Sequence, residues 1–512
     1  MKHRIVALAV ASVLVTAVSA TAVSATAVSA TTTPPRAPDG AGPPPPGRTP
    51  PPRPTPPPGT GSSGEAWAWT QLTSHGTQIR YVSTDTSQTC PSVRYTLGTQ
   101  MTVPLQRVST PVGAHFPTTV CESGSQTPVP LGASNAHLLP GTVQAATLHP
   151  TGGHLPLPTW TTTTRPGTID VIGDTGCELP VNPADPAQHC ATAWPFKPIA
   201  DSVARAAPDL VIHTGDYLYR NDPGRADDKA RNPGCTMRTD ASSWACVVAD
   251  FFRPAEALLA AAPVALTRGN HEDCTQPGGA GDAWFRYLAD ELRNGSCSRF
   301  PPPATIRAGT LNLVSVDSSS ADDSGTAQVN TYARQFDIVN QAAQQRSSED
   351  FFVVTHKPVW MVKAAGQAQG AVEWATHVLD DAVAHTSLGR LANNVRLALS
   401  GHIHLYQMLD FNTRRPPQLT VGSSGGPLDD GPIDSNAMRQ QIGTPGQTVH
   451  NARTQEEAPT ATPPRLGGVF GYGQLHHNNG TWDLTFHRTD GSVRGQTCTL
   501  STSLTNKSFS CH

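Results

Sequence analysis

The chain has 512 residues and a formal net charge of −3, with 36 basic and 39 acidic side chains. This length exceeds one ordinary domain, so we expect two domains together with export and linker segments. The near-neutral charge excludes a polybasic footprint, and we expect neither nucleic acid nor an anionic membrane surface as an obligate partner.

The amino terminus is typical of a signal peptide. Residues 2–4 are basic in character, residues 5–18 are apolar, and Thr-Ala-Val-Ser-Ala occurs three times within residues 16–30. Each repeat ends in a small-residue pattern of the kind that a signal peptidase cleaves, which places cleavage after Ala20, Ala25 or Ala30. A membrane anchor is disfavoured because spanning a bilayer needs about 20 apolar residues. We therefore expect a secreted, extracellular protein without a transmembrane segment.

Residues 31–64 form a proline-rich linker. This composition favours the polyproline II conformation, which rises about 3.1 Å per residue. The linker would act either as a semi-rigid spacer that holds the protein near a cell wall or as a disordered leader. The sequence leaves both open.

Residues 65–165 predict a small all-β domain, which we expect to be sandwich-like. Short apolar runs such as residues 77–82 and 118–121 alternate with Gly, Pro and Ser, and no helical period is present. The histidines of this segment are scattered without ligand spacing, so we assign no chemistry to it.

Residues 166–512 predict an α/β domain. Apolar residues recur at helical spacing in three segments, residues 198–207, 250–261 and 372–383, and strand-like runs alternate with them. Near the carboxyl end, Asn479 and Gly480 separate two apolar runs, which indicates a β-hairpin. Strands and helices interleaved in this way predict a two-sheet sandwich flanked by helices.

Five short motifs rich in metal-ligand residues follow strand-like runs in this region. They are Gly173-Asp174-Thr175-Gly176, Gly215-Asp216-Tyr217-Leu218-Tyr219, Gly269-Asn270-His271-Glu272, Thr355-His356 and Gly401-His402-Ile403-His404. Because the carboxyl ends of buried parallel strands meet at one rim of a sheet, we expect these side chains to converge. Carboxylate, amide and imidazole donors together indicate metal-assisted hydrolysis.

Ten cysteines in a secreted chain imply disulfide bonds. Pairing neighbours in sequence gives five short loops: Cys90–Cys121, Cys177–Cys190, Cys235–Cys246, Cys274–Cys297 and Cys498–Cys511. Cys177 and Cys274 lie just after the first and third motifs, so the alternative is that they bind metal as thiolates. Soft thiolates would select other metals than the hard oxygen and imidazole donors do, which favours pairing.

In this order the motifs resemble those of the calcineurin-like metallophosphoesterase superfamily, and more narrowly its purple acid phosphatase branch. Most of the superfamily has Asp-x-His in the first motif, whereas this chain has Gly176 at the histidine position. In the purple acid phosphatase branch that loss accompanies a tyrosine three residues after the second-motif aspartate, where this chain has Tyr219. The fourth motif, His356-Lys357-Pro358-Val359-Trp360, is also similar to that branch. The resemblance covers roughly residues 168–430.

The resemblance implies two adjacent metal ions, Fe(III) and a divalent ion such as Zn, Fe or Mn. The implied ligands are Asp174, Tyr219 and His404 for the first ion, Asn270, His356 and His402 for the second, and Asp216 bridging both. Two ions about 3.5–4 Å apart can clamp a phosphoryl group and deliver a metal-bound hydroxide. A carboxylate suits the bridge because its two oxygens carry several lone pairs.

Charge favours Tyr219 as a ligand of Fe(III). A tyrosinate in place of a neutral histidine offsets the extra charge of Fe(III) relative to Fe(II), so the net charge of the site is unchanged. A phenol with a pKa of about 10 ionises near neutral pH only beside such a cation. The alternative is that Tyr219 only packs, as we expect of Tyr217.

His271 and Asp216 are the expected catalytic residues. The resemblance implies that His271 is not a ligand but contacts a phosphate oxygen and protonates the leaving alkoxide, as a group titrating near about pH 6.5 can. The alternative, that His271 orients Asp216, stays open. We expect Glu272 to support the ligands and His213 to be a core histidine bonded to the backbone.

Together these features predict a secreted dinuclear-metal phosphoesterase that hydrolyses small phosphomonoesters by a metal-bound hydroxide. One alternative is a phosphodiesterase with the same site, acting on a nucleotide, a phospholipid headgroup or a wall polymer. Its distinguishing side chains would lie in loops such as residues 221–243 and 321–330. The other alternative is a surface binding protein that uses the fold as a scaffold, which the complete set of donors disfavours.

Overall fold

A computed structural model describes most of the chain after the linker: residues 64–85, 89–124, 127–139, 147–179, 187–220, 232, 234–235, 243–275, 280–293, 297–322, 325–364, 372–374, 378–429, 449–454 and 469–512. All of them belong to one unit, Ser62–His512. The predicted signal peptide and nearly all of the linker lie outside the described residues. None of the described helices has the length and apolarity needed to cross a membrane.

Twelve of the described strands form the first sheet, which joins the motif-bearing region to the β-rich region before it. Its strands in spatial order are β25 (Phe509–Cys511), β24 (Val493–Leu500), β23 (Thr481–Arg488), β22 (Gly471–Asn478), β10 (Thr168–Ile172), β11 (Leu210–His213), β12 (Val264–Leu266), β1 (Glu65–Thr73), β2 (Gly76–Ser83), β6 (Thr119–Glu122) and β5 (Gln106–Ser109), with β8 (Thr147–His149) paired to β1. Strands β10, β11 and β12 pair in parallel.

The second sheet has seven described strands and a parallel centre. Its order is β13 (Ala304–Ala308), β14 (Leu311–Ser315), β15 (Asp350–Val354), β18 (Val395–Ser400), β20 (Gln418–Val421), β19 (Tyr406–Asp410) and β21 (Asn451–Thr454). Strands β14, β15, β18 and β20 run parallel. All five motifs therefore follow strands that pair in parallel: β10, β11 and β12 in the first sheet, and β15 and β18 in the second.

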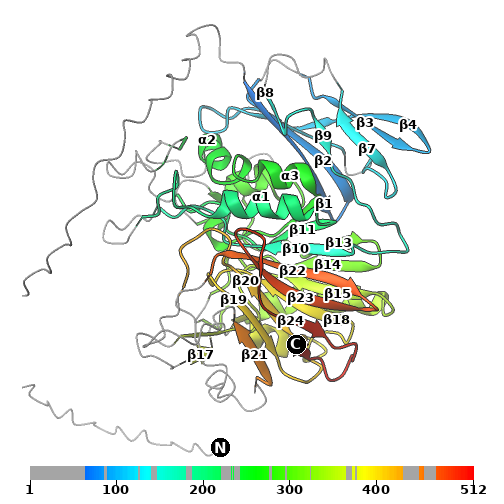
Figure 1. Cartoon of the computed structure of the whole chain (residues 1–512), viewed down its shortest axis with the longest axis vertical. Coiled ribbons are helices and arrows are strands. Elements are labelled where there is room, and N and C mark those ends of the chain that lie inside the picture. The colour runs from blue at the N-terminus through cyan, green and yellow to red at the C-terminus, as the bar shows by residue number, and fades with distance from the viewer. Residues whose placement is uncertain are drawn as a thin grey trace, which may run out of the picture. The chain divides into compact units, whose positions relative to one another are not determined.

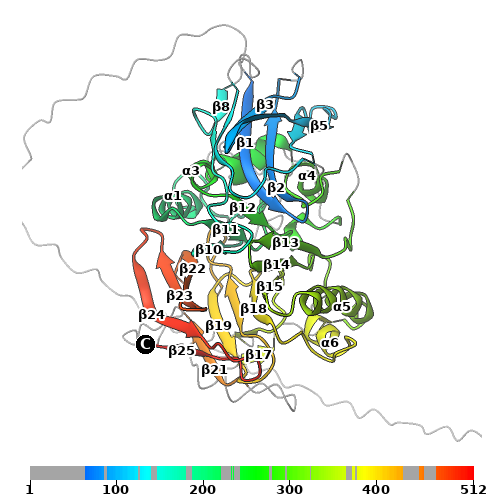
Figure 2. The same ribbon diagram turned by 90° about the vertical axis from the view of Figure 1, so that its right-hand side faces the viewer.

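The two sheets pack face to face, and helices cover their outer faces (Figures 1 and 2). Ile169 and Val171 of β10 share a buried cluster with Phe352 and Val354 of β15, so alternate residues of both strands face the space between the sheets. Helices α1 (Phe196–Ala206) and α3 (Glu256–Ala261) share the cluster on the outer face of the first sheet. Helices α5 (Val329–Gln345) and α6 (Val378–Ala384) do the same on the second. The predicted α/β sandwich is confirmed.

Every described regular element between residues 65 and 155 is a strand, in agreement with the predicted all-β region. Strands β4 (Thr99–Pro104), β3 (Ser92–Leu97), β7 (Ser134–Leu138) and β9 (His154–Leu155) form a separate sheet. Its Val93 and Leu138 share a buried cluster with Ala68 of β1 and Tyr81 of β2, which makes this region sandwich-like. Because β1 also pairs with β12, the domain boundary at residue 165 stays a prediction.

All ten cysteines pair with the neighbour that the sequence predicted. The disulfides are Cys90–Cys121, Cys177–Cys190, Cys235–Cys246, Cys274–Cys297 and Cys498–Cys511. The thiolate alternative for Cys177 and Cys274 is therefore wrong, because both sulfurs are bonded to another cysteine.

Two of the three predicted helices need correction. The segment 198–207 is α1 as predicted, but Val372–Trp374 is a strand, β17, paired with β16 (Val362–Ala364), and helix α6 begins only at Val378. A three-residue strand is too short to show a period, so the helical pattern was extended through it. The segment 250–261 contains a π-helical turn, Val248–Phe252, before α3. Pro254 lacks the N–H that would continue the helix without interruption.

Other elements were either missed or confirmed. The sequence did not identify α2 (Trp244–Val247), α4 (Ala280–Tyr287) or α5. The hairpin of β22 and β23 forms as predicted. Asn479 and Gly480 at its turn have φ of 49° and 84°, the left-handed values that this pair of residues tolerates.

Asp170, buried in β10, gives a prediction about stability and pH. Its Oδ1 accepts a 2.9 Å hydrogen bond from Gln474, and burial outweighs that bond and raises the carboxyl pKa to about 7. Between about pH 4 and pH 7 the unfolded chain ionises Asp170 while the folded chain keeps the proton. Asp170 should therefore contribute a fall in the free energy of unfolding as pH rises, by about 1.4 kcal/mol per unit.

Asp170→Asn cannot ionise and should remove this contribution to the slope. The measurement is the urea midpoint of unfolding at several pH values between 4 and 8. Asp201, half-exposed on α1 and paired with Lys197, supplies the control Asp201→Asn, which should leave the slope in place. Equal slopes for wild type and Asp170→Asn would contradict the prediction.

Candidate metal centre

The five motif loops meet at the carboxyl ends of the parallel strands of both sheets. Asp174 follows β10 and Asp216 follows β11, while Asn270 follows β12 in a 3-10 turn, Asn270–Glu272. His356 follows β15, and the loop after β18 carries His402 and His404. The face-to-face packing of the two sheets brings these ends together, as the sequence predicted.

One group of predicted ligands surrounds the hydroxyl of Tyr219. This oxygen lies 2.7 Å from Oδ2 of Asp216, 3.1 Å from Oδ1 of Asp174 and 2.8 Å from Nε2 of His404. Asp174 belongs to the first motif, Asp216 and Tyr219 belong to the second, and His404 belongs to the fifth. They are the residues that the resemblance assigned to the first ion and to the bridge.

A second group surrounds Nε2 of His356. This atom lies 2.8 Å from Oδ1 of Asn270 and 3.1 Å from Oδ2 of Asp216. The potential ligand atoms of Asp216, His356 and His402 all lie within 4.8 Å of one another. The structure therefore brings all seven predicted ligands together, and Asp216 touches both groups.

Two imidazoles are oriented by backbone carbonyls. Nδ1 of His356 lies 3.0 Å from the carbonyl oxygen of Thr214, and Nδ1 of His404 contacts that of Pro427. A histidine whose Nδ1–H donates to a carbonyl presents the lone pair of Nε2, and this is how metal-ligating histidines are commonly held. In both residues Nε2 faces the cluster.

The charges of the cluster fit bound cations. Asp174 and Asp216 are at most 1% exposed, and none of the hydrogen bonds or ion pairs described for them comes from a lysine or arginine. Burial opposes ionisation of Asp216, but the imidazoles of His356 and His271 hold its pKa well below the usual value. Burial and both carboxylates raise the pKa of Tyr219 well above 10. Cations at this place would compensate the carboxylates and stabilise the phenolate.

The backbone of three predicted ligands is strained. Asp174, Asp216 and His402 have φ of 56°, 59° and 74°, a left-handed conformation that costs non-glycine residues about 1 kcal/mol or more each.

Gly269 lets two loops approach closely, because a Cβ there would lie 2.0 Å from Oδ1 of Asp216. Gly401 does the same, with a Cβ position 2.3 Å from Oδ2 of Asp174.

Gly176 and Tyr219 are sterically coupled. A Cβ at residue 176 would lie 2.5 Å from Cδ2 of Tyr219 and 2.8 Å from its backbone nitrogen. A histidine at residue 176 is therefore incompatible with the observed position of Tyr219. The exchange of one side chain for the other, noted in the sequence, has a direct packing reason.

His271 and Glu272 lie beside the predicted ligands. The backbone N–H of His271 donates to Oδ1 of Asp216 at 2.9 Å, while its ring lies 4.0 Å from that of Tyr219, centroid to centroid. Its buried Nδ1 has no hydrogen-bond partner among the described residues. Glu272 accepts N–H bonds from Tyr217 and Leu218 at 2.9 Å each, and so joins the second motif to the third.

His213 and Tyr217 occupy core positions. Nδ1 of His213 accepts the N–H of Gly215 at 3.1 Å, and its Nε2 lies 2.8 Å from Oγ1 of Thr175. The hydroxyl of Tyr217 donates to the carbonyl of Thr267 at 3.0 Å, and its ring stacks on His213. Both residues thus pack as the sequence analysis expected.

Sequence reasoning missed the residues that hold the motif loops from outside. Asp250, fully buried in the π-helical turn, accepts the N–H groups of Cys177 and Tyr219 at 2.9 and 3.0 Å. Ser424, after β20, pairs with the backbone of Gly173. A π-helical turn has no clear sequence signal. The sequence also does not distinguish a serine that is buried and hydrogen-bonded from a serine on the surface. Only the glycines around Ser424 pointed to a tight loop.

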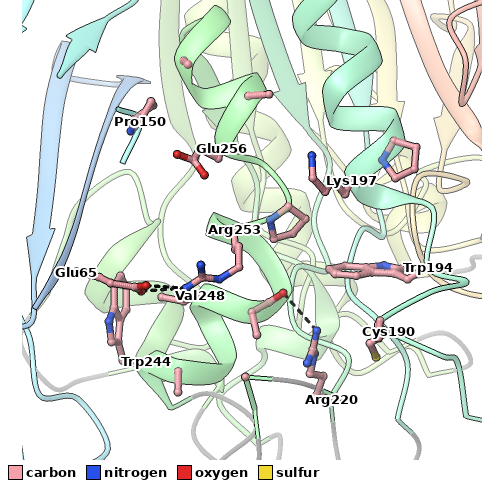
Figure 3. Close-up of a pocket in the computed structure, with 18 of the residues that line it drawn as sticks. Glu65, Pro150, Cys190, Trp194, Lys197, Arg220, Trp244, Val248, Arg253 and Glu256 are labelled. Atoms are coloured by element: carbon pink, nitrogen blue, oxygen red, sulfur yellow. Dashed lines mark hydrogen bonds and ion pairs between the residues drawn. The ribbon is translucent and has the colours of Figure 1, made fainter. Parts of the chain in front are cut away.

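A cavity of about 1030 Å³ opens beside this region but contains none of the predicted ligands. Figure 3 shows Trp194, Lys197 and Arg220 on one side of it and Glu65 and Arg253 on the other. Three of its charged groups are already engaged in ion pairs: Arg253 with Glu65 at 2.9 Å, Arg220 with Asp250 at 3.0 Å and Lys197 with Asp201 at 2.8 Å. The candidate metal centre is therefore the donor cluster and not this cavity.

Comparison with known proteins agrees with this geometry. Residues 167–406, which contain all seven predicted ligands, match the calcineurin-like phosphoesterase family. No curated protein shows a match. Among solved structures, PhoD aligns at 11% identity with a TM-score of 0.54, covering 88% of this chain and 93% of its own, which shows a shared fold. Purple acid phosphatase PPD1 from yellow lupin (Lupinus luteus) seeds aligns at 12% identity with a TM-score of 0.48, covering 84% and 72%.

A phosphoesterase site with two metal ions is what this family and this donor set imply. The seven donors come from five loops that the matched region supplies in full. Through residues 167–406, the chain is similar to the calcineurin-like phosphoesterase family.

Proposed function

We propose that the protein is a secreted phosphomonoesterase with a purple acid phosphatase-like Fe(III)–divalent metal centre. The observation that carries the proposal is the hydroxyl of Tyr219, which contacts Asp174, Asp216 and His404 within 3.1 Å. Gly176 supports it, because any side chain there would displace Tyr219. A tyrosinate is a hard anionic ligand and suits Fe(III) better than a divalent ion.

The donor groups define two positions that share Asp216. Asp174, Tyr219 and His404 would hold Fe(III), and Asn270, His356 and His402 would hold a divalent ion such as Zn, Fe or Mn. When bound, such a pair lowers the pKa of water and compensates the charge of the phosphate. Asp216 keeps the two positions adjacent, since its carboxylate contacts Tyr219 in one group and His356 in the other.

His271 is the residue we propose as the proton donor to the leaving group. Its backbone N–H donates to Oδ1 of Asp216 and can orient that carboxylate, while Nδ1 of the ring has no described partner. A buried imidazole without a protein partner is available to a phosphate oxygen or to the leaving alkoxide. Both roles considered for His271 can therefore be filled, one by its backbone and one by its ring.

Secretion and the partners are part of the same proposal. Five disulfides support an oxidising compartment, and the signal-peptide pattern at the amino terminus agrees with it. The partner is a small phosphate ester, without an obligate nucleic-acid partner, and the proline-rich linker would keep the enzyme near the cell wall. Most of the loop 221–243, where substrate selectivity was expected, lies outside the described residues.

Tyr219→Phe tests the metal assignment. The purified protein is expected to show a visible charge-transfer band between the phenolate and Fe(III), and this variant should abolish the band. Tyr217→Phe is the matched control, because its hydroxyl bonds Thr267 in the core and not the donor cluster. A colourless, fully active protein whose Tyr219→Phe variant is unaffected would refute the Fe(III) centre. Elemental analysis of the native protein identifies both metals.

Substrate class is tested by comparing an aryl phosphate with the matching diaryl phosphate diester. Preference for the monoester is expected, and preference for the diester would replace the proposal with the phosphodiesterase alternative. Absence of turnover on both, in a protein that holds two metal ions, would favour the binding-protein alternative.

A further inference from the structure

The segment that follows β14, residues 317–321, contains no predicted ligand, and only its last residue belongs to a loop named in the sequence analysis. It is nevertheless buried throughout: Asp317, Ser318, Ser319, Ser320 and Ala321 are each at most 9% exposed. Polar side chains are rarely so buried without a structural or functional reason. We call residues 317–321 the bracing loop.

The bracing loop contacts the third motif on both sides of Asn270. Oδ2 of Asp317 pairs with Nε of Arg268 at 2.8 Å, two residues before Asn270. The hydroxyl of Ser320 donates to the carboxylate of Asp273, three residues after it. Both Arg268 and Asp273 are at most 5% exposed, so these polar contacts are shielded from water.

The bracing loop also holds the backbone of the fourth motif. Oγ of Ser318 accepts the N–H groups of His356 and Lys357 at 3.0 and 2.9 Å. The carbonyl of Ala321 accepts a 2.8 Å bond from Nζ of Lys357. Because β15 ends at Val354, these N–H groups have no partner within the sheet. Ser318 accepts the hydrogen bonds of both.

The loop is itself rigidly built. Oδ1 of Asp317 accepts bonds from the N–H and hydroxyl of Ser319 at 3.1 and 2.7 Å. Val316, just before it, is tied to the end of β15 by a 2.9 Å bond to the carbonyl of Val354. A loop anchored in this way can transmit the position of the sheet to the groups that it touches.

The contacts of the bracing loop with the motifs are confined to the third and fourth motifs, which carry Asn270 and His356. In the part of the chain that the structure describes, none of the hydrogen bonds of the bracing loop reaches Asp174, Tyr219 or His404. Those residues are held from the other side by the segment after β20: Gly426 donates its N–H to the carbonyl of Asp174 at 2.7 Å, and the carboxylate of Asp429 accepts the N–H of His404 at 2.9 Å.

We propose that the bracing loop is the positioning element of the second metal position, the one formed by Asn270, His356 and His402. The inference rests on the proposed two-metal site and assigns Ser318 and Ser320 as positioning residues that touch neither metal nor substrate. Ser318 sets where His356 leaves β15, and Ser320 with Asp317 fixes the turn that carries Asn270. Loss of these bonds loosens the second position and leaves the first intact.

Ser318→Ala is the main test. Holoprotein is dialysed against increasing concentrations of a chelator, and the metal content per chain is measured together with the visible band of Tyr219. Wild type should hold two ions. In Ser318→Ala the second ion should be lost at a chelator concentration about 10- to 100-fold lower, the usual effect of removing a group that supports a metal ligand. The visible band of Tyr219 should persist.

A second variant and a matched control complete the design. Ser320→Ala removes a separate bond of the same loop and should shift the loss of the second ion in the same direction, which decides the matter if Ser318→Ala does not fold. Thr118→Val removes an equally buried hydroxyl, bonded to Tyr287 at 2.8 Å and remote from the donor cluster. It should keep both ions at the wild-type chelator midpoint.

The outcomes separate this inference from the proposed function. If wild type holds two ions and the serine variants lose them as wild type does, or lose both ions together with the visible band, the positioning role is overturned and the metal centre stands. If wild type itself holds fewer than two ions, the proposed function is wrong. The inference, which rests on it, is then wrong as well.

Discussion

Replacing His356 with alanine is expected to lower kcat/KM for an aryl phosphate by at least about 10³-fold. Removing a group that merely supports a metal ligand costs about 10- to 100-fold, and removing the ligand itself should cost more. His356 is fully buried, and its Nε2 contacts both Asn270 and the shared carboxylate of Asp216. Its loss therefore removes a donor from the second metal position.

Metal content distinguishes loss of the second ion from general misfolding. His356→Ala should retain the visible band of Tyr219 and fall from two ions to about one. His137→Ala is the control, since His137 lies on β7 in the separate four-stranded sheet. It should keep full turnover and both ions. Turnover retained by His356→Ala would remove the basis of the metal assignment.

Asp250→Ala is expected to lower the free energy of unfolding by about 3–5 kcal/mol, the usual cost of breaking a buried ion pair from one side. Asp250 is fully buried and bonds the guanidinium of Arg220, 2% exposed, at 3.0 Å. It also accepts the N–H groups of Cys177 and Tyr219. The variant leaves a buried charge and two backbone donors without their partner.

A double variant tests whether the unpaired charge of Arg220 causes the loss of stability. Asp250→Ala with Arg220→Met removes both charges and should recover part of the loss, because no unpaired charge remains. The exposed pair of Glu65 and Arg253 supplies the control: Glu65→Ala should cost less than about 1 kcal/mol. Urea unfolding measures the wild type and all three variants. An Asp250→Ala protein as stable as wild type would show that this carboxylate does not hold the loop of Tyr219.

The chemistry of the site was readable because its ligands lie at strand ends in short motifs. Four of the five motifs combine glycines with donors, and the glycines at residues 269 and 401 turn out to be required by close approach to Asp216 and Asp174. The family match covers these motifs and no more than residues 167–406. Sequence reasoning failed where a residue acts through the backbone of another segment, as Ser318 and Asp250 do. The identity of a serine or an aspartate does not indicate from which distant N–H group its side chain accepts a hydrogen bond.

The sequence by itself determined the features that depend on neighbouring residues: the apolar runs that make β10 and β15 buried strands, the Asn479-Gly480 turn and the pairing of nearby cysteines. Only the tertiary structure decided which loops touch. The contact of Tyr219 with Asp174, the room that Gly176 leaves for it and the bond from His356 to Ser318 all join separate segments of the chain. Such contacts depend on the register of the strands and on the packing of one sheet against the other. Local propensity carries no information about either.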